Sequence, residues 1–363
     1  MTLKADLLSC FLEGEAAPPL FVPDLTLWYE WHQSRGTLPE DWQGRSLPEI
    51  ARRLNAPIWL PVQVWRIETP GIETKTVEEA DKRTITYETP AWSLTARWTR
   101  GPNGDWWQTE YPVKSEGDLE GAVELIESRS YVLDTSRLSN LRADVAQDGV
   151  VALALPKRPY SQILHDFLGW SDGLLLLGEP EVQKMLTLLE SKLQHLVEQV
   201  AELPGEIVLS PDNLDGQFIS PGAFQRYLAG SYRRTCELLH DHDKRIVIHI
   251  GGPIRRLLEP LAETGADGIE GICGRPQSDA SLSEARGLVG PGMTLWGGVP
   301  QDVLLDARPW DEFETAVAHA VAQSTEKDRM ILGVADRVPV QTELDRLKAI
   351  SSWIQASRST KEW

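Results

Sequence analysis

The sequence has few of the features that mark secreted, membrane-spanning or nucleotide-binding proteins. It contains only 3 cysteines (Cys10, Cys236 and Cys273), which form no CxxC pair and no disulfide framework. No apolar run approaches the roughly 20 residues that a membrane helix needs. Neither GxGxxG after a strand nor GxxxxGK[ST] occurs, so the usual sequence support for a nucleotide site is missing.

Basic residues are also in short supply. There are 36 lysines and arginines against 54 acidic residues, which gives a formal net charge of −18. This charge opposes binding to nucleic acid or to an anionic membrane, so we expect neither partner. The first 15 residues lack the apolar core and cleavage site of a secretory signal, and with so few cysteines we expect a cytoplasmic protein. The sequence is compatible with a small-molecule substrate and with assembly into a homo-oligomer.

The sequence shows two different patterns of apolar and polar residues along the chain. Residues 62–114 are rich in short alternating runs such as "RTITYET" and "WSLTARWTR", which predict antiparallel β-hairpins. From about residue 145, short apolar runs alternate with amphipathic helical patterns, as in "KRIVIHIGG" followed by "PIRRLLEPLAETG". Such alternation is typical of βαβ units in a parallel sheet.

At least five of these units follow one another, and this favours a closed (β/α)8 TIM-type barrel over an open sheet. We expect barrel strands at 56–65, 149–156, 205–213, 244–252, 266–273, 293–300 and 329–336. The chain 1–363 is then a single α/β barrel domain, and 62–114 is a hairpin insertion or lid.

Polar side chains stand where these strands end. In barrels of this type the active site lies at the carboxyl ends of the strands. His249 follows three apolar residues and precedes Gly251 and Gly252, which would leave room for a ligand beside the backbone. The other residues at predicted strand ends are Asp212, Asn213, Glu270, Cys273, Trp296 and Asp336. They could assemble a metal site or a general acid–base pair.

Simpler interpretations exist for several of these residues. Asp212 or Asp336 could cap the next helix, and Cys273 could be a small buried hydrophobe. His240 and His242 are spaced like a metal pair, but a solvated helix end explains them as well. In the aromatic stretch 23–36, Trp28, Trp31 and His32 would share one helix face, which favours core packing. The alternative is an aromatic wall beside a substrate, to which Trp28 and Tyr29 would belong.

The stretches "RIVIHIGGPIRRLLEPLAETGADGIEG", "LSEARGLVGPGMTLWGGVP" and "MILGVADRVPVQTELDRLKAI" resemble the uroporphyrinogen decarboxylase superfamily. The resemblance covers most of the chain after residue 145 and lies nearer the cobamide-dependent methyltransferases than the true decarboxylases. In that branch, a His-x-Cys pair and a later cysteine hold a zinc ion that activates a thiol. Here His249 matches, but Gly251 and Asp336 stand where the cysteines would be.

The resemblance therefore implies a changed ligand set, in which His249, Glu270 and Asp336, and possibly Cys273, would bind Zn²⁺. True uroporphyrinogen decarboxylases carry an "RQAGRY"-like segment that pairs with substrate carboxylates and a histidine after the last strand. This chain has "LWYEWHQSRG" near the first position and Asp336 at the second. A polycarboxylate substrate is therefore disfavoured.

Three functions follow from the resemblance. The first is methyl transfer linked to a corrinoid, either free or on a partner protein. In this function His249, Asp336 and Asp212 would be catalytic, and Asn213, Trp28, Tyr29, Gly251 and Trp296 would contact the substrate. The second is a metal-independent decarboxylase that stabilises its intermediate with Asp212 or Asp336. The third is a barrel without catalysis that serves as a binding or assembly subunit.

Overall fold

The computed structural model describes residues 2–12, 20–101, 104–326 and 329–359. They form two compact units. The first, which we call the parallel-sheet unit, comprises Met1–Val62, Ser136–Ala154 and Pro204–Trp363. The second, the hairpin unit, comprises Gln63–Thr135 and Leu155–Leu203. The assignment of 1–363 to one domain stays a prediction.

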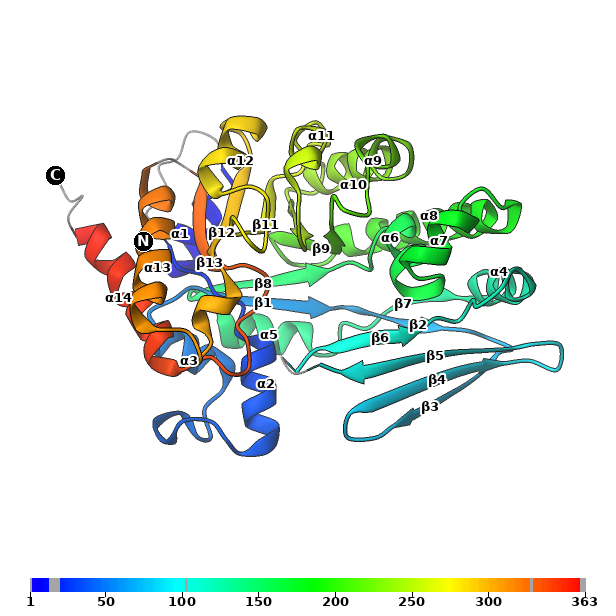
Figure 1. Ribbon diagram of the computed structural model, residues 1–363, viewed down its shortest axis with the longest axis horizontal. Coiled ribbons are helices and arrows are strands. Elements are labelled where there is room, and N and C mark those ends of the chain that lie inside the picture. Colours follow the sequence, from blue (N-terminus) through cyan, green and yellow to red (C-terminus); the bar gives the residue numbers. More distant parts are fainter. Residues whose placement is uncertain (1, 13–19, 102–103, 327–328, 360–363) are drawn as a thin grey trace. The chain divides into compact units, whose positions relative to one another are not determined.

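The parallel-sheet unit is built on a seven-stranded sheet with the order β1-β8-β9-β10-β11-β12-β13 (Figure 1). Every strand pairs in parallel with its neighbour from β8 to β13. All seven strands fall where the apolar runs predict them. Their bounds are β1 Ile58–Gln63, β8 Gly149–Ala154, β9 Ile207–Leu214, β10 Arg245–Ile250, β11 Gly268–Ile272, β12 Thr294–Val299 and β13 Met330–Val334.

One further segment joins this sheet beside β13. Phe21 forms a parallel bridge with Leu332. The N–H of Val22 donates to the carbonyl of Leu332 (2.8 Å), and the N–H of Leu332 donates to the carbonyl of Leu20 (2.9 Å). The α/β fold with a parallel sheet is thus confirmed. Closure into a complete eight-stranded barrel stays a prediction.

Helices follow the strands of this unit, and several begin at side-chain caps. Ser46 and Glu49 form a reciprocal capping box at α3, and Ser281 and Glu284 form another at α12. The helices are α1 Leu3–Ser9, α2 Thr26–Arg35, α3 Leu47–Arg53, α5 Leu138–Val145, α9 Pro221–Tyr227, α10 Ala229–His240, α11 Leu258–Ala262, α12 Leu282–Val289, α13 Trp310–Glu326 and α14 Leu344–Ser359. Short 3₁₀ turns lie at Glu40–Trp42, Arg255–Leu257 and Gln301–Leu304.

The strands of the parallel-sheet unit are buried on both faces, and one core cluster takes every second residue of β8 and β9. Val150 and Ala152 of β8 and Ile207 and Leu209 of β9 are buried in one cluster, together with Val247 of β10. Side chains two residues apart on a strand share a face. A residue two positions beyond such a core residue therefore points to the same side, at the carboxyl end of the strand.

The hairpin unit contains the antiparallel hairpins that the alternating runs predict. Its four-stranded sheet has the order β3-β4-β5-β6, and a separate pair joins β2 to β7. The strands are β2 Trp65–Glu68, β3 Glu73–Glu78, β4 Lys82–Glu88, β5 Ser93–Arg100, β6 Trp106–Glu110 and β7 Ser130–Leu133. The helices are α4 Leu119–Ser128, α6 Pro159–Gln162, α7 Trp170–Leu176 and α8 Pro180–Ala201, with a 3₁₀ turn at Glu116–Asp118 and a π-helical segment at Ile163–Phe167.

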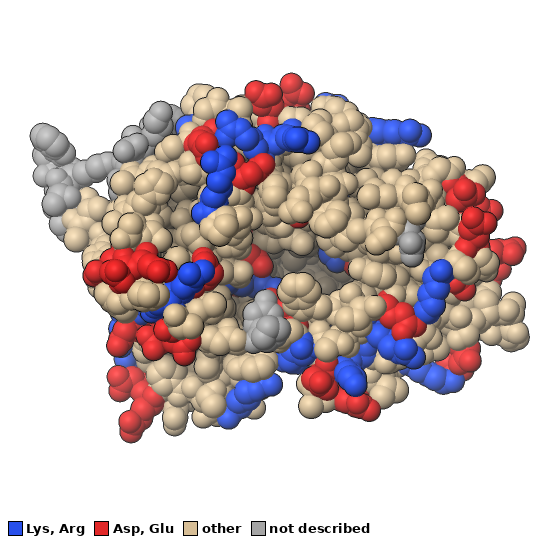
Figure 2. All heavy atoms as spheres, in the orientation of Figure 1, with Lys and Arg blue, Asp and Glu red and all other residues tan. Residues whose placement is uncertain are grey.

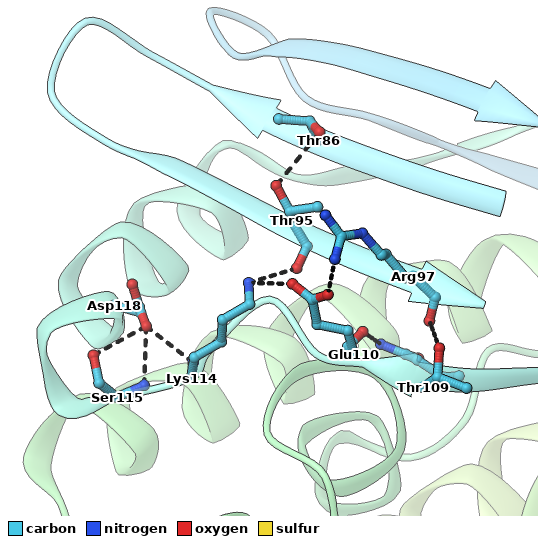
Figure 3. A network of polar contacts seen from close by, with 9 residues as sticks. Thr86, Thr95, Arg97, Thr109, Glu110, Lys114, Ser115 and Asp118 are labelled. Carbon is cyan, nitrogen blue, oxygen red and sulfur yellow. Dashed lines mark hydrogen bonds and ion pairs between the residues drawn. The ribbon is translucent and has the colours of Figure 1, made fainter.

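Polar contacts fix the end of the antiparallel sheet to the start of α4 (Figure 3). Arg97 of β5 and Lys114 both pair with the carboxylate of Glu110, at 2.5 and 3.0 Å. Lys114 also donates to the carbonyl of Thr95 at 3.0 Å. Asp118 accepts from the backbone N–H groups of Lys114 and Ser115, which closes the turn before the helix. The role of these hairpins as a lid stays a prediction.

The surface carries both signs of charge. Figure 2 shows basic and acidic side chains interspersed over the face that it draws, despite the net charge of −18. Within the described ranges, no helix is long and apolar enough to cross a membrane.

The pairing of β1 with β8 depends on Gly149. A Cβ atom built at Gly149 would overlap the backbone of Ile58, which cannot move without breaking the pairing. We expect Gly149→Ala to lower the free energy of unfolding by about 1–3 kcal/mol, as overpacking does elsewhere. Gly287 in α12 is the control, because its Cβ would meet nothing and alanine favours helix. Urea denaturation measures both variants, and equal stability of the two would contradict the prediction.

Candidate functional site

A cavity of about 400 Å³ lies at the carboxyl ends of the strands, and every residue that lines it belongs to the parallel-sheet unit. This is the end at which barrel enzymes carry their active sites. The cavity is lined by Asp24, Thr26, Trp59, Pro61, Ala154, Leu209, Pro211, Asn213, His249, Glu270, Asp336 and Arg337. The structure thus brings four of the predicted site residues into one space: Asn213, His249, Glu270 and Asp336.

His249 and Glu270 face each other because of the strand register. They are direct partners in the parallel pairing of β10 with β11. His249 also stands two residues beyond the core residue Val247, so its ring points inward. Its Nδ1 lies 2.5 Å from Oε2 of Glu270, and the side chains are 15% and 11% exposed. A buried imidazole and a buried carboxylate therefore share a short hydrogen bond.

Asp336 completes the group from the loop after β13. Its Oδ1 lies 3.6 Å from Nε2 of His249 and 3.5 Å from Nε of Arg337. Its backbone has a φ of 71°, in the left-handed region that few residues other than glycine adopt. Strained residues of this kind cluster at functional sites. Both ring nitrogens of His249 thus face acidic oxygens.

These charges decide the protonation of the ring. Burial by itself would lower the pKa of His249, but the charge and hydrogen bond of Glu270 and the charge of Asp336 raise the pKa to about 9. Burial raises the pKa of Glu270 above its ordinary value, against the opposing pull of His249. At neutral pH the imidazole is therefore doubly protonated, with Nδ1–H donating to Glu270.

The predicted zinc site does not fit this arrangement. No group of three or more His, Cys, Asp or Glu residues in the described part of the chain is placed to hold a metal ion. Nδ1 of His249 is engaged by Glu270, which leaves only Nε2 of the ring for a ligand. Burial raises the pKa of the Cys273 thiol to about 12, so it is not a thiolate, and it does not line the cavity.

The amide of Asn213 occupies the space next to Gly251. A Cβ atom built at Gly251 would collide with Oδ1 of Asn213. Asn213 itself has a left-handed φ of 51°. The absence of a side chain at position 251 therefore lets the Asn213 amide lie beside the backbone after His249. Gly251 supports the cavity wall without lining it.

Asp212 lies on the opposite side of its strand. Leu209, Pro211 and Asn213 line the cavity, whereas Asp212 between them points away. Its Oδ2 accepts from the hydroxyl of Ser210 at 2.7 Å and from that of Tyr232 at 2.5 Å, and the residue is fully buried. The structure thus places the predicted catalytic Asp212 in a hydrogen-bond network against α10.

The predicted aromatic contacts also lie outside the cavity. Trp28 is 1% exposed, and its Nε1 donates to the carbonyl of Thr342. The hydroxyl of Tyr29 donates to the carbonyl of Arg45. Trp296 lies in the sheet core, where its ring meets that of Trp59 edge to face at 4.7 Å. Trp28 thus packs in the core, the simpler interpretation of the aromatic stretch, whereas Tyr29 is only half-buried.

Eight of the lining residues were not predicted as site residues, and among them Asp24, Trp59 and Arg337 bring a charged or large aromatic side chain. Trp59 is the second residue of β1, and only the alternation of that strand could have indicated its direction. Burial raises the pKa of Asp24, against hydrogen bonds from the N–H and hydroxyl of Thr26. The N–H of Val338 donates to the carbonyl of Asp24, which ties this segment to the loop of Asp336 and Arg337.

Comparison with known proteins adds to this picture. Residues 174–356, half of the 363-residue chain, match the family described as Uroporphyrinogen decarboxylase (URO-D). Among solved structures, a methyltransferase from Methanosarcina mazei is similar with a TM-score of 0.61 at 16% identity, covering 98% of this chain and 99% of that one. A D-psicose 3-epimerase from Clostridium cellulolyticum H10 gives a TM-score of 0.38 at 9% identity, covering 70% and 96%. No curated protein sequence matches the chain.

Structural likeness at such low identity shows a shared fold and does not show a shared activity. The sequence match is of a different kind, because it spans the strands from β9 to β13 that carry Asn213, His249, Glu270 and Asp336. The chain therefore belongs to the uroporphyrinogen decarboxylase (URO-D) family.

Proposed function

We propose that the protein is a methyl-transfer enzyme that acts on a small methylated molecule and uses His249 as its general acid. One observation carries the proposal: an imidazole held protonated by Glu270 and Asp336 lines a cavity at the carboxyl ends of the strands. Membership of the URO-D family and the fold shared with a methyltransferase support the reaction class.

The chemistry needs an acid at this position. When a methyl group leaves oxygen, nitrogen or sulfur for a nucleophilic acceptor, the heteroatom keeps the bonding electrons and takes up a proton. Nε2–H of His249 would supply that proton, while Glu270 holds Nδ1–H and keeps the ring in place. A positioned general acid of this kind contributes typically about 10²–10⁴-fold to the rate. In the zinc-dependent relatives that the sequence resembles, the metal activates a thiol; here no step requires one.

The acceptor is proposed to be a corrinoid, either free or carried by a partner protein. A volume of about 400 Å³ is near the lower end of the range for ligand sites, about 300–1,000 Å³. It suits a small methyl donor and leaves a macrocycle outside, at the mouth. Three carboxylates among the lining residues, Asp24, Glu270 and Asp336, disfavour a polyanionic donor.

A second candidate is a metal-independent decarboxylase. Arg337 lines the same cavity and lies beside Asp336, where its guanidinium could bind a substrate carboxylate. Loss of CO₂ leaves an electron pair on carbon, and Nε2–H of His249 would protonate that carbon. The two reactions thus use the same acid and differ in the substrate.

The first test is methyl transfer to free cob(I)alamin from a panel of methanol, dimethyl sulfide, trimethylamine and guaiacol, followed by absorbance. We expect at least one donor to react and His249→Gln to lower the rate about 100-fold or more, because the proton donor is lost. His195→Gln is the control, since that side chain is 72% exposed and lies in the hairpin unit.

Activity in the presence of EDTA is expected to match that without it. Full activity of His249→Gln would contradict the role of His249. If no donor methylates the corrinoid and CO₂ is released instead from small carboxylic acids, the decarboxylase is the correct function.

The second test is the pH profile of kcat/KM. Because the acid is the protonated form, activity should persist above the ordinary histidine pKa of 6.5 and fall as pH rises through about 9. Glu270→Gln removes the charge that raises the pKa of His249, so its profile should break at lower pH. A wild-type break near 6.5, or an unchanged break in Glu270→Gln, would show that another group limits the rate.

A further inference from the structure

A second cavity, of about 470 Å³, lies at the amino ends of the same strands. Its lining residues stand where strands begin: Arg245 opens β10, Asp267 precedes β11, Met293 precedes β12 and Arg329 precedes β13. All of them belong to the parallel-sheet unit. This end of the sheet carries none of the residues of the proposed methyl-transfer site.

The cavity is lined by more positive than negative groups. Arg245, Arg329 and His240 face it, and Asp267 is the one acidic residue among its described lining residues. Asp267 is already engaged: its Oδ2 accepts from the N–H of Ile246 at 2.8 Å and lies 2.9 Å from Nε2 of His240. Its Oδ1 lies 3.7 Å from Nε of Arg245. One carboxylate therefore faces one guanidinium group and an imidazole, and the guanidinium of Arg329 lines the same cavity.

Arg329 carries a positive charge that the carboxylate of Asp267 does not neutralise. The residue is 8% exposed, and its backbone is held at a φ of 60°. Its Nε donates to the carbonyl of Cys10 at 3.3 Å, and its Nη1 donates to the carbonyl of Gly292. Among the residues that the structure describes, no acidic side chain pairs with it. Carbonyls orient a guanidinium without neutralising it, and a buried, unneutralised charge is unfavourable.

The rest of the wall is apolar. Phe11, Ala262, Val289 and Met293 line the cavity beside the basic groups. A ligand that fits has an anionic oxygen group for the guanidinium forks and a short apolar part. The net charge of −18 repels anions from the protein as a whole. An anion would therefore be held here by direct contacts with the basic side chains.

We propose that this cavity is a binding site for a small oxyanion, a phosphate or carboxylate group, held by Arg329, Arg245 and His240. The site is independent of the methyl-transfer proposal, because it shares no residue with the cavity of His249. The failure of one proposal would therefore leave the other unaffected.

The test measures unfolding in urea at rising concentrations of inorganic phosphate or of butyrate, with sodium chloride keeping the ionic strength constant. We expect saturable stabilisation, with an approximately elevenfold rise in the folded-to-unfolded ratio at ten times Kd. Stabilisation by phosphate alone assigns a phosphate ligand, and stabilisation by butyrate alone assigns a carboxylate. The absence of saturable stabilisation by either anion would overturn the proposal.

Variants separate a specific site from general ion effects. Arg245→Gln should lower the affinity for the anion about tenfold or more, because it removes a charge-assisted hydrogen bond. Arg255→Gln is the matched control, because that arginine also pairs with one carboxylate, Glu284, but does not line the cavity. Arg329→Lys, which keeps the charge and loses the fork, should weaken binding as well. Equal stabilisation of Arg245→Gln, Arg255→Gln and the wild type would overturn the proposal.

Discussion

The site depends on one constraint, the register between β10 and β11. Because His249 and Glu270 are partners across that pairing, a ring and a carboxylate face each other in a mostly buried space. Neither group is well accommodated alone, since a buried charge without its partner is strongly unfavourable. The pair therefore fixes the ring orientation and its protonation together, and Asp336 then faces the remaining nitrogen. The proposed reaction uses the proton on Nε2 of His249, which the neighbouring carboxylates of Glu270 and Asp336 keep on the ring.

Much of the fold could be predicted from local patterns. Short apolar runs located β8 to β13, because strands buried on both faces need continuous apolar sequence. The meeting of His249, Glu270 and Asp336 followed from the rule that parallel strands end together. Asp212 shows where that rule is insufficient. Strand ends indicate position along the sheet but not face, and Asp212 points to Tyr232 while its neighbours Pro211 and Asn213 line the cavity.

Other features depend on tertiary structure. Asp24 and Trp59 reach the cavity from segments with no strand-end signal, and Arg337 adds a cation directly after the predicted Asp336. The zinc prediction rested on the family resemblance and on residue types that are suitable ligands, whereas coordination requires suitable positions. Glu270 engages one nitrogen of His249, and the Asn213 amide fills the space beside Gly251. The sequence left a metal site and an acid–base pair open, and the contact between His249 and Glu270 is that of a pair.

The contact of residues 20–24 with residues 332–338 has a consequence for biosynthesis. Asp24 is tied through its carbonyl to Val338, and Phe21 bridges Leu332 of the last strand. A ribosome must therefore release the chain through residue 338 before these segments can meet, so a nascent chain that stops before β13 has no assembled cavity. Premature truncation before β13 would remove Asp336 and Arg337 and also the strand against which the N-terminal segment lies.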